Sequence, residues 1–297
     1  MSLAIEINNL SKSFDDNQAL KDISFQVEEG SIFGFLGPNG AGKTTTIKIL
    51  MGLMKADRGT VRVLGMDCEK ETFKINQQLA YVAEVDQLYD YMKVREIIEF
   101  TKGFYRNWNQ NLLEKYLDFF NLPLDKKIKN LSKGMKKQLS LVLALAVEPK
   151  LLILDEPTSG LDPVNKQEIL RIILEEISTQ GRTVFFSSHL LSDIERIADT
   201  VAIINKGKII DLRSVDDIKE NVKKVRVVFQ KEPDENVLRQ AGIESYKQQG
   251  NAYIFTIDDN FQEVLKNLKQ HPHFTLDIIE RNLEEIFIDK VKGDVNA

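Results

Sequence analysis

The sequence predicts an α/β fold with a largely parallel sheet and a phosphate-binding loop, followed by a smaller α+β domain. The first observation behind this prediction is a glycine-rich stretch, residues 37–45, between a strand pattern and a helix pattern. The second is a pair of continuous apolar runs within residues 150–157 and 183–189, typical of parallel strands buried on both faces. The third is a change in the pattern of apolar residues after about residue 220, where short strand and helix patterns alternate.

Composition and charge limit the kinds of protein that this sequence can be. The chain has 297 residues, of which 42% are hydrophobic and 29% charged, as expected for a soluble globular protein of one large or two modest domains. The net charge of −5 argues against a nucleic-acid partner, since such proteins usually carry a basic excess. The single cysteine, Cys68, cannot form a disulfide within the chain, which fits a reducing cytoplasm.

The sequence contains no segment that we expect to span a membrane. Its first residues lack the basic head and apolar core of a signal peptide. The longest apolar run, residues 139–147 with one serine, is far shorter than the roughly 20 residues that span a bilayer. If the protein works at a membrane, we therefore expect other chains to do the crossing.

The elements of the first domain follow in order from local patterns. Strand patterns occur early, at residues 4–10, 20–27, 32–37, 60–65 and 79–84. A helix is predicted after the glycine-rich loop, at residues 42–53, and apolar spacing of three and four residues predicts a helical region from Val94 to about Ala146. Residues 166–178 are expected to form the crossover helix between the two buried strands. Residues 200–211 are expected to form a hairpin that turns at Lys206-Gly207.

The last part of the chain predicts a second, ferredoxin-like domain. Its patterns follow the order β-α-β-β-α-β-α, at residues 225–230, 235–242, 243–249, 251–258, 261–270, 274–281 and 283–291. This order suits a small layer of helices on a sheet. We expect the boundary near Ser214 to Glu220, with the first domain over residues 1–215 and the second over residues 220–297.

The glycine-rich stretch has the chemistry of a phosphate cradle. It fits G-x-x-x-x-G-K-[ST], and the residues expected to bind nucleotide are Gly37, Pro38, Asn39, Gly40, Ala41, Gly42, Lys43, Thr44 and Thr45. The glycines let the loop curl so that successive N–H groups point at a phosphate. Lys43 would neutralise the β- and γ-phosphate oxygens, and the Thr44 hydroxyl would ligate Mg²⁺. The alternative, a glycine-rich turn before an ordinary helix, fits the strand–loop–helix order less well.

The run Leu151–Pro157 supplies the acidic partner of this loop. Asp155, at the end of a buried strand, can hold the Mg²⁺ ion, and Glu156 can act as the general base that polarises the attacking water. Paired acids seldom end a buried strand without a cation nearby. The two motifs together predict a site for ATP with Mg²⁺.

A second candidate anion site lies at the start of a predicted helix, residues 133–148. Ser132 and Gly134 form a small polar turn there, and the helix is expected to stop before Pro149 because a proline disfavours helical angles in the residue before it. Unpaired N–H groups at such a turn attract anions. A chain with two anion sites needs an explanation.

These features together resemble the ABC-type ATPases. The stretch from Leu131 to Gln138 resembles their signature sequence, residues 151–163 resemble the strand and D-loop that follow, and residues 187–189 resemble the segment of the switch histidine. With the loop at residues 37–45, the order and spacing match over roughly residues 3–210, about two-thirds of the chain. The resemblance implies a P-loop NTPase of the ABC-ATPase type, with a helical subdomain at about residues 85–146.

The resemblance also implies a role for several single residues. In that family two subunits pack head to tail, which implies that Ser132 and Gly134 contact the γ-phosphate held by the other subunit. His189 is implied to contact the γ-phosphate and position water, and Asp162 to communicate across the dimer. Phe14 matches the aromatic residue that stacks on adenine, and the less favoured alternative is a core phenylalanine. The expected catalytic residues are thus Lys43, Glu156 and His189.

The sequence departs from the family pattern at three places. Glu84 stands at the usual Q-loop glutamine, where it could still approach Mg²⁺ but adds negative charge near the γ-phosphate; Gln87 is the alternative assignment. Lys133 and Met135 replace the first glycine and the glutamine of the signature. Gln138 stands where many relatives carry arginine, which removes a charge.

The family resemblance suggests an ATP-hydrolysing subunit of an exporter. The C-terminal part is similar to the small appended region of exporter-type, bacitracin-resistance-like ATPase subunits. The expected partners are integral-membrane permease subunits and a second ATPase subunit, identical or related, with the protein bound peripherally at the cytoplasmic face of the membrane. The alternatives are a soluble ABC-type ATPase and a nucleotide switch without turnover.

Overall fold

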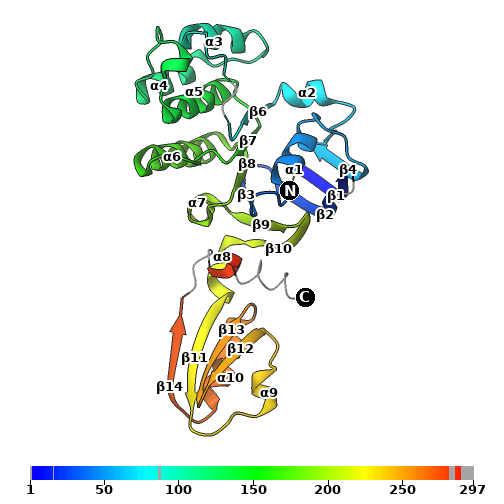
Figure 1. The fold of residues 1–297 in the computed structure, drawn as a ribbon, viewed down its shortest axis with the longest axis vertical. Coiled ribbons are helices and arrows are strands. Elements are labelled where there is room, and N and C mark those ends of the chain that lie inside the picture. The colour runs from blue at the N-terminus through cyan, green and yellow to red at the C-terminus, as the bar shows by residue number, and fades with distance from the viewer. Residues whose placement is uncertain (1, 16, 86–87, 281–284, 289–297) are drawn as a thin grey trace. The chain divides into compact units, whose positions relative to one another are not determined.

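A computed structural model describes residues 2–15, 17–85, 88–280 and 285–288 (Figure 1). Contacts between residues divide the chain into two compact units, Met1–Leu212 and Arg213–Ala297. No helix in the described part of the chain is both long and apolar enough to cross a membrane.

The first unit contains an antiparallel sheet of four strands in the order β2-β1-β4-β5. Its strands are β1 (Leu3–Phe14), β2 (Asn17–Glu28), β4 (Arg58–Val63) and β5 (Met66–Asp67). β1 and β2 form a long hairpin in which Phe14 pairs with Asn17. The hairpin therefore carries Phe14 at its end.

The second sheet of this unit has six strands in the order β10-β9-β3-β8-β7-β6. They are β3 (Ile32–Leu36), β6 (Leu79–Val82), β7 (Leu151–Asp155), β8 (Thr183–Ser188), β9 (Thr200–Asn205) and β10 (Lys208–Ser214). Strands β6, β7, β8, β3 and β9 run parallel. The turn between β9 and β10 has positive φ at Lys206 and Gly207, which is the geometry of a two-residue hairpin turn, and this confirms the predicted turn.

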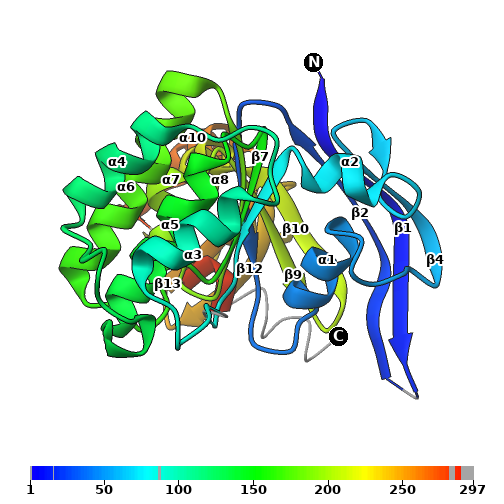
Figure 2. The ribbon, with the colours of Figure 1, turned by 90° about the horizontal axis from the view of Figure 1, so that it is seen from above.

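Helices cover the two sides of this unit differently (Figure 2). They are α1 (Lys43–Leu50), α2 (Thr72–Asn76), α3 (Val94–Lys102), α4 (Gln110–Phe119), α5 (Lys133–Ala146), α6 (Pro163–Gln180), α7 (Leu191–Ile197) and the short 3₁₀ helix η1 (Ile128–Asn130). Both ribbon views place α3, α4, α5 and α6 on one side, while α1 lies with the antiparallel sheet on the other. The predicted helical region from Val94 to Ala146 is thus divided into α3, α4, η1 and α5.

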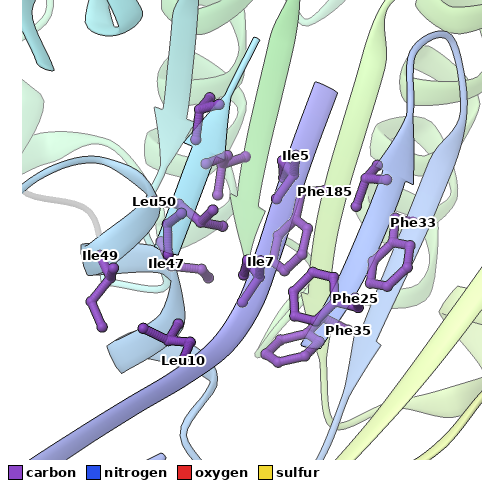
Figure 3. Packing of buried hydrophobic residues seen from close by; sticks show 14 of the residues in the cluster. Ile5, Ile7, Leu10, Phe25, Phe33, Phe35, Ile47, Ile49, Leu50 and Phe185 are labelled. Atoms are coloured by element: carbon purple, nitrogen blue, oxygen red, sulfur yellow. The ribbon is translucent and has the colours of Figure 1, made fainter. Parts of the chain in front are cut away.

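An aromatic core joins the two sheets and holds α1 in place (Figure 3). Phe25 of β2 stacks on Phe33 of β3 with ring centroids 5.2 Å apart, and Phe185 of β8 stacks on Phe33 at 5.7 Å. Ile47 and Leu50 of α1 are fully buried in the same cluster. Because α1 begins where the glycine-rich loop ends, this core also fixes the position of the loop.

The second unit has the predicted β-α-β-β-α-β order. After α8 (Val215–Asn221) it contains β11 (Lys223–Phe229), α9 (Glu235–Leu238), β12 (Ile243–Gln249), β13 (Ala252–Ile257), α10 (Phe261–Gln270) and β14 (His273–Ile279). The sheet is antiparallel in the order β12-β13-β11-β14, and α10 packs on it in a core of its own. The sequence did not predict α8, which Ser214 caps by accepting a hydrogen bond from the Asp217 N–H at 3.0 Å. Of the predicted helix at residues 283–291, the structure describes 285–288, which are helical; the rest lies outside the described residues.

Candidate active site

The glycine-rich loop curls between the end of β3 and the start of α1. Gly42, which precedes α1, has φ of 115°, a left-handed conformation that side-chain-bearing residues rarely adopt. The Lys43 ammonium donates a hydrogen bond to the Gly37 carbonyl at 2.7 Å, across the mouth of the loop. The first turn of α1 directs its N–H groups and the positive end of its dipole toward the same point. The loop therefore has the donors of a phosphate site.

A cavity of about 410 Å³ lies over this loop. It is lined by Phe14, Asn17, Ala19, Pro38, Asn39, Gly40, Gly42, Lys43, Thr44, Thr45, Glu84, Asp155 and Glu156. Apart from Phe14, Asn17 and Ala19 of the β1–β2 hairpin, the lining residues lie at or after the carboxyl ends of parallel strands, which is where α/β sheets bind ligands. Segments as distant as the β1–β2 hairpin and the end of β7 thus share one cavity.

Asp155 is held at the end of β7 by three hydroxyl groups. The Ser187 hydroxyl of β8 donates to one carboxylate oxygen at 2.5 Å. The other oxygen accepts from Thr44 at 3.3 Å and from Tyr81 at 3.5 Å. Burial, together with the nearby Asp155 charge, raises the pKa of Tyr81 above its ordinary value, so Tyr81 stays a neutral donor. The Asp155–Thr44 pair offers two adjacent oxygen atoms to a cation.

Glu156 lies between a cation and a histidine. One carboxylate oxygen is 3.2 Å from the Lys43 ammonium, and the other is 2.7 Å from Nδ1 of His189. The Glu156 side chain is 4% exposed, whereas His189 is 40% exposed and can meet a ligand. Glu156 also has φ of 48°, an unusual conformation for a non-glycine residue, and its N–H donates to the Ser187 carbonyl at 3.0 Å. Strain of this kind gathers at functional sites.

Two further predicted residues, Phe14 and Glu84, also line the cavity. Phe14 is 43% exposed at the tip of its hairpin, so its ring is not a core residue and is free to stack on a base. Glu84 follows β6 and adds a third carboxylate to those of Asp155 and Glu156. Gln87, the alternative assignment for the Q-loop position, lies outside the described residues.

Six predicted residues do not line this cavity, and one of them is His189, which instead contacts Glu156 as described above. Gly37 contributes its carbonyl to Lys43, and Ala41 is buried in the hydrophobic core. Ser132 is exposed and caps α5 by accepting a hydrogen bond from the Met135 N–H at 3.1 Å, with Gly134 in the first turn. Asp162 caps α6 by accepting from the Val164 and Asn165 N–H groups at 3.0 and 3.1 Å. The signature and D-loop residues of this chain are thus separate from its own cavity.

Sequence reasoning missed several residues that the structure brings to the site. Ser187 holds both acids, and Tyr81 donates to Asp155. Asn17 and Ala19 line the cavity beside Phe14. Ser187 belongs to a recognised motif, but only the pairing of β8 with β7, which sets Ser187 opposite Asp155, shows its role.

Comparison with known proteins decides the family. The model of the ABC transporter family matches residues 20–159. YtrB, an ABC transporter ATP-binding protein of Bacillus subtilis (strain 168), is 32% identical over 290 residues, which cover 97% of this chain and 98% of that protein. The chain belongs to the ATP-binding subunits of ABC transporters. The expected family and fold class are confirmed.

A second relative and a solved structure each match about three-quarters of this ABC subunit. The bacitracin transport ATP-binding protein BcrA of Bacillus licheniformis is 35% identical over 226 residues, covering 75% of this chain and 74% of that protein. A solved structure of an ATP-binding subunit of an ABC transporter has a TM-score of 0.67 at 31% identity, covering 73% of this chain and 92% of that one. The ABC subunit is accordingly an ATPase, and ATP is its substrate.

Proposed function

We propose that this ABC subunit hydrolyses ATP with Glu156 as general base and thereby powers an exporter whose membrane-spanning parts are separate chains. The observation that carries the proposal is the position of Glu156, between Lys43 and His189 beside the phosphate loop. A buried carboxylate held by two groups from distant segments is arranged for a specific chemical task.

The chemistry assigned to each residue follows from its contacts. Glu156 accepts a proton from the attacking water, and His189, at 2.7 Å, orients the carboxylate and reaches outward to the γ-phosphate. Lys43 and the N–H groups at the start of α1 neutralise the β- and γ-phosphate oxygens. Phe14 stacks on the adenine at the rim of the cavity. The subunit thus stabilises charge and positions the water rather than forming a covalent intermediate.

The residues around Asp155 fit a magnesium ion. The Thr44 hydroxyl and the Asp155 carboxylate lie 3.3 Å apart, and both are oxygen ligands of the kind that Mg²⁺ prefers beside phosphates. Thr44 and Asp155 would hold the ion, with Glu84 within the same cavity. When bound, Mg²⁺ would help to neutralise the charge that develops on the phosphate during hydrolysis.

A second subunit explains the residues that lie away from the cavity. Ser132 and Gly134 are exposed or partly exposed at the start of α5 and do not line the cavity of their own chain. In a head-to-tail dimer they would complete the cavity of the other subunit, where the N–H groups of α5 would meet the γ-phosphate. Asp162 would lie at the same interface. ATP would then draw two subunits together, and hydrolysis would release them.

The closing and opening of the dimer is proposed to move a membrane-spanning partner. The similarity to a protein named for bacitracin transport supports transport. The outward direction is proposed from the resemblance of the C-terminal sequence to exporter-type subunits. On and beside α3 lie four exposed aromatic residues, Tyr91, Tyr89, Phe100 and Phe104. In this order, each ring contacts the next. Exposed apolar clusters of this kind mark interaction sites. The subunit would bind there to its permease, at the cytoplasmic face of the membrane.

The substitution Glu156→Gln tests the proposed chemistry. Removal of a general base typically costs 10²–10⁴ in rate, so kcat should fall by at least about 100-fold while ATP affinity changes little. The matched control is Glu99→Gln, at an exposed position of α3, which should leave kcat unchanged. The same Glu156→Gln protein with ATP and Mg²⁺ should run as a dimer in sedimentation. A kcat within tenfold of the parent, or a protein that stays monomeric, would contradict the proposal.

Isolation from native membranes separates transport from the alternatives. If the subunit co-purifies with a multi-span partner, a soluble ABC-type ATPase is excluded. Measurable ATP turnover excludes a nucleotide switch without hydrolysis. Recovery of the active ATPase with no membrane protein would favour the soluble alternative.

A further inference from the structure

The helix that begins at the Ser132 turn carries a fully buried lysine. Lys137, in the second turn of α5, is 0% exposed. Its ammonium donates hydrogen bonds to the carbonyl oxygens of Ala83 and Glu84, at 2.6 and 2.7 Å. Both carbonyls lie just past the end of β6, and Glu84 lines the nucleotide cavity. The lysine therefore joins the signature helix to the backbone beside the cavity.

The burial of an ammonium group costs free energy that packing alone does not require. Lysine is rarely buried completely unless its charge is compensated, because the charge loses its hydration. A methionine or leucine at this position would fill a similar volume without that cost. The presence of lysine here points to the two hydrogen bonds rather than to packing.

The neighbouring residue of α5 makes a similar link on another side. Gln138 is 4% exposed and donates a hydrogen bond to the Asn165 side chain at 2.6 Å, and Asn165 in turn donates to Asp162 of the D-loop. At the position where the family pattern has arginine, this chain thus makes a neutral hydrogen bond. Two consecutive residues of α5 thus form hydrogen bonds with two separate segments, residues 83–84 and the first turn of α6.

We infer that Lys137 is a positioning residue that couples Glu84 to the Ser132 turn, so that nucleotide bound in one cavity sets the orientation of the turn offered to the partner subunit. The inference rests on the proposed two-subunit site. α5 is a rigid helix, and Lys137 lies about 7 Å along its axis from Ser132 at 1.5 Å per residue. A displacement of the backbone at residues 83–84 must therefore move the start of α5, because two short hydrogen bonds join them.

The test uses the full chain with Glu156→Gln, which holds ATP without turnover. Lys137→Met is added, and Lys136→Met serves as the matched control because the Lys136 ammonium pairs instead with Asp90, at 2.7 Å on the surface. Two quantities are measured, the affinity of the dilute monomer for ATP and the ATP-dependent dimerisation constant. We expect Lys137→Met to weaken dimerisation at least tenfold and to change ATP affinity less than twofold. Lys136→Met should change neither by more than twofold.

A double-mutant cycle with Glu84→Ala separates coupling from simple support of the fold. If Lys137 transmits the state of residue 84, the combined variant should dimerise no worse than the weaker single variant. The inference would be overturned if the losses in the dimerisation constant of the two single variants multiplied in the double variant. An equal loss in ATP affinity and in dimerisation would overturn it as well. If Lys137→Met does not fold, Lys137→Gln carries the same test, because its shorter side chain cannot reach both carbonyls. A Glu156→Gln parent that never dimerises would instead overturn the two-subunit site, and the inference with it.

Discussion

At the scale of single residues, the active site holds more negatively charged than positively charged side chains. Three carboxylates, Glu84, Asp155 and Glu156, line one cavity, and Lys43 is the cation beside them. Asp155 and Glu156 have the contacts described above, which hold their carboxylates in place. Glu84 instead adds a negative charge at a position where the family usually has a neutral glutamine. ATP is itself anionic, so this charge should matter most when no metal neutralises the phosphates.

We therefore predict that Glu84→Gln reduces the effect of Mg²⁺ on ATP binding. The repulsion between two like charges about 6 Å apart is about 1.4 kcal/mol at an effective dielectric constant near 40. Removing this repulsion corresponds to a factor of about ten in affinity. The variant should thus bind a fluorescent ATP analogue about ten times more tightly than the parent in EDTA, and similarly in saturating Mg²⁺. The titration reads binding and does not require turnover. Equal affinities in EDTA would show that the Glu84 carboxylate does not face the phosphates.

At the scale of elements, a buried polar link joins the helical region to the rest of the first unit. The Tyr116 hydroxyl of α4 donates to Glu176 of α6 at 2.5 Å, and Arg182 forms an ion pair with the same carboxylate at 2.8 Å. Tyr116 is 1% exposed, and burial followed by the hydrogen bond to Glu176 raises its pKa. Tyr116 therefore stays protonated, and keeps its hydrogen-bond donor, at pH values where an exposed tyrosine begins to ionise.

Tyr116→Phe should destabilise this link with little change of shape. It removes one hydrogen bond from a buried carboxylate, which costs about 1–3 kcal/mol in the free energy of unfolding. Tyr91→Phe is the control, because Tyr91 is 67% exposed. Urea unfolding of both variants against the parent measures the difference. A loss below about 0.5 kcal/mol for Tyr116→Phe would mean that Glu176 finds another donor.

At the scale of the whole molecule, the nucleotide cavity belongs to the first unit. All of its lining residues lie between Phe14 and Glu156. The second unit has a hydrophobic core of its own, built from β11, β13 and α10. A unit with its own core can in principle fold by itself. ATP binding should therefore be separable from the second unit.

A chain ended after Ser214 should bind ATP as tightly as the full chain. This end keeps β10 whole and removes α8 and the ferredoxin-like sheet. Binding of a fluorescent ATP analogue should agree within about twofold, with Lys43→Ala in both chains as the control that abolishes phosphate binding. A folded truncated chain that binds ATP at least tenfold more weakly would show that the second unit supports the cavity.

The local patterns of this sequence determined a large share of the fold and site. The phosphate loop, the acids at the end of β7, the buried parallel strands and the order of the second unit depend on neighbours in the chain, so they can be predicted from it. Short elements were harder: α9 ends at Leu238 although a helix to residue 242 was expected, and α8 was not predicted. In such short segments tertiary contacts outweigh propensity.

Only the tertiary structure decided how the residues of the site act on one another. That Ser187 holds Asp155, that Glu156 lies between Lys43 and His189, and that Lys137 turns inward to β6 all depend on segments far apart in the chain. Sequence spacing determines which residues share a strand end or a helix face. The direction and length of a hydrogen bond depend on how sheets and helices pack, and packing brings together residues that the chain itself keeps apart.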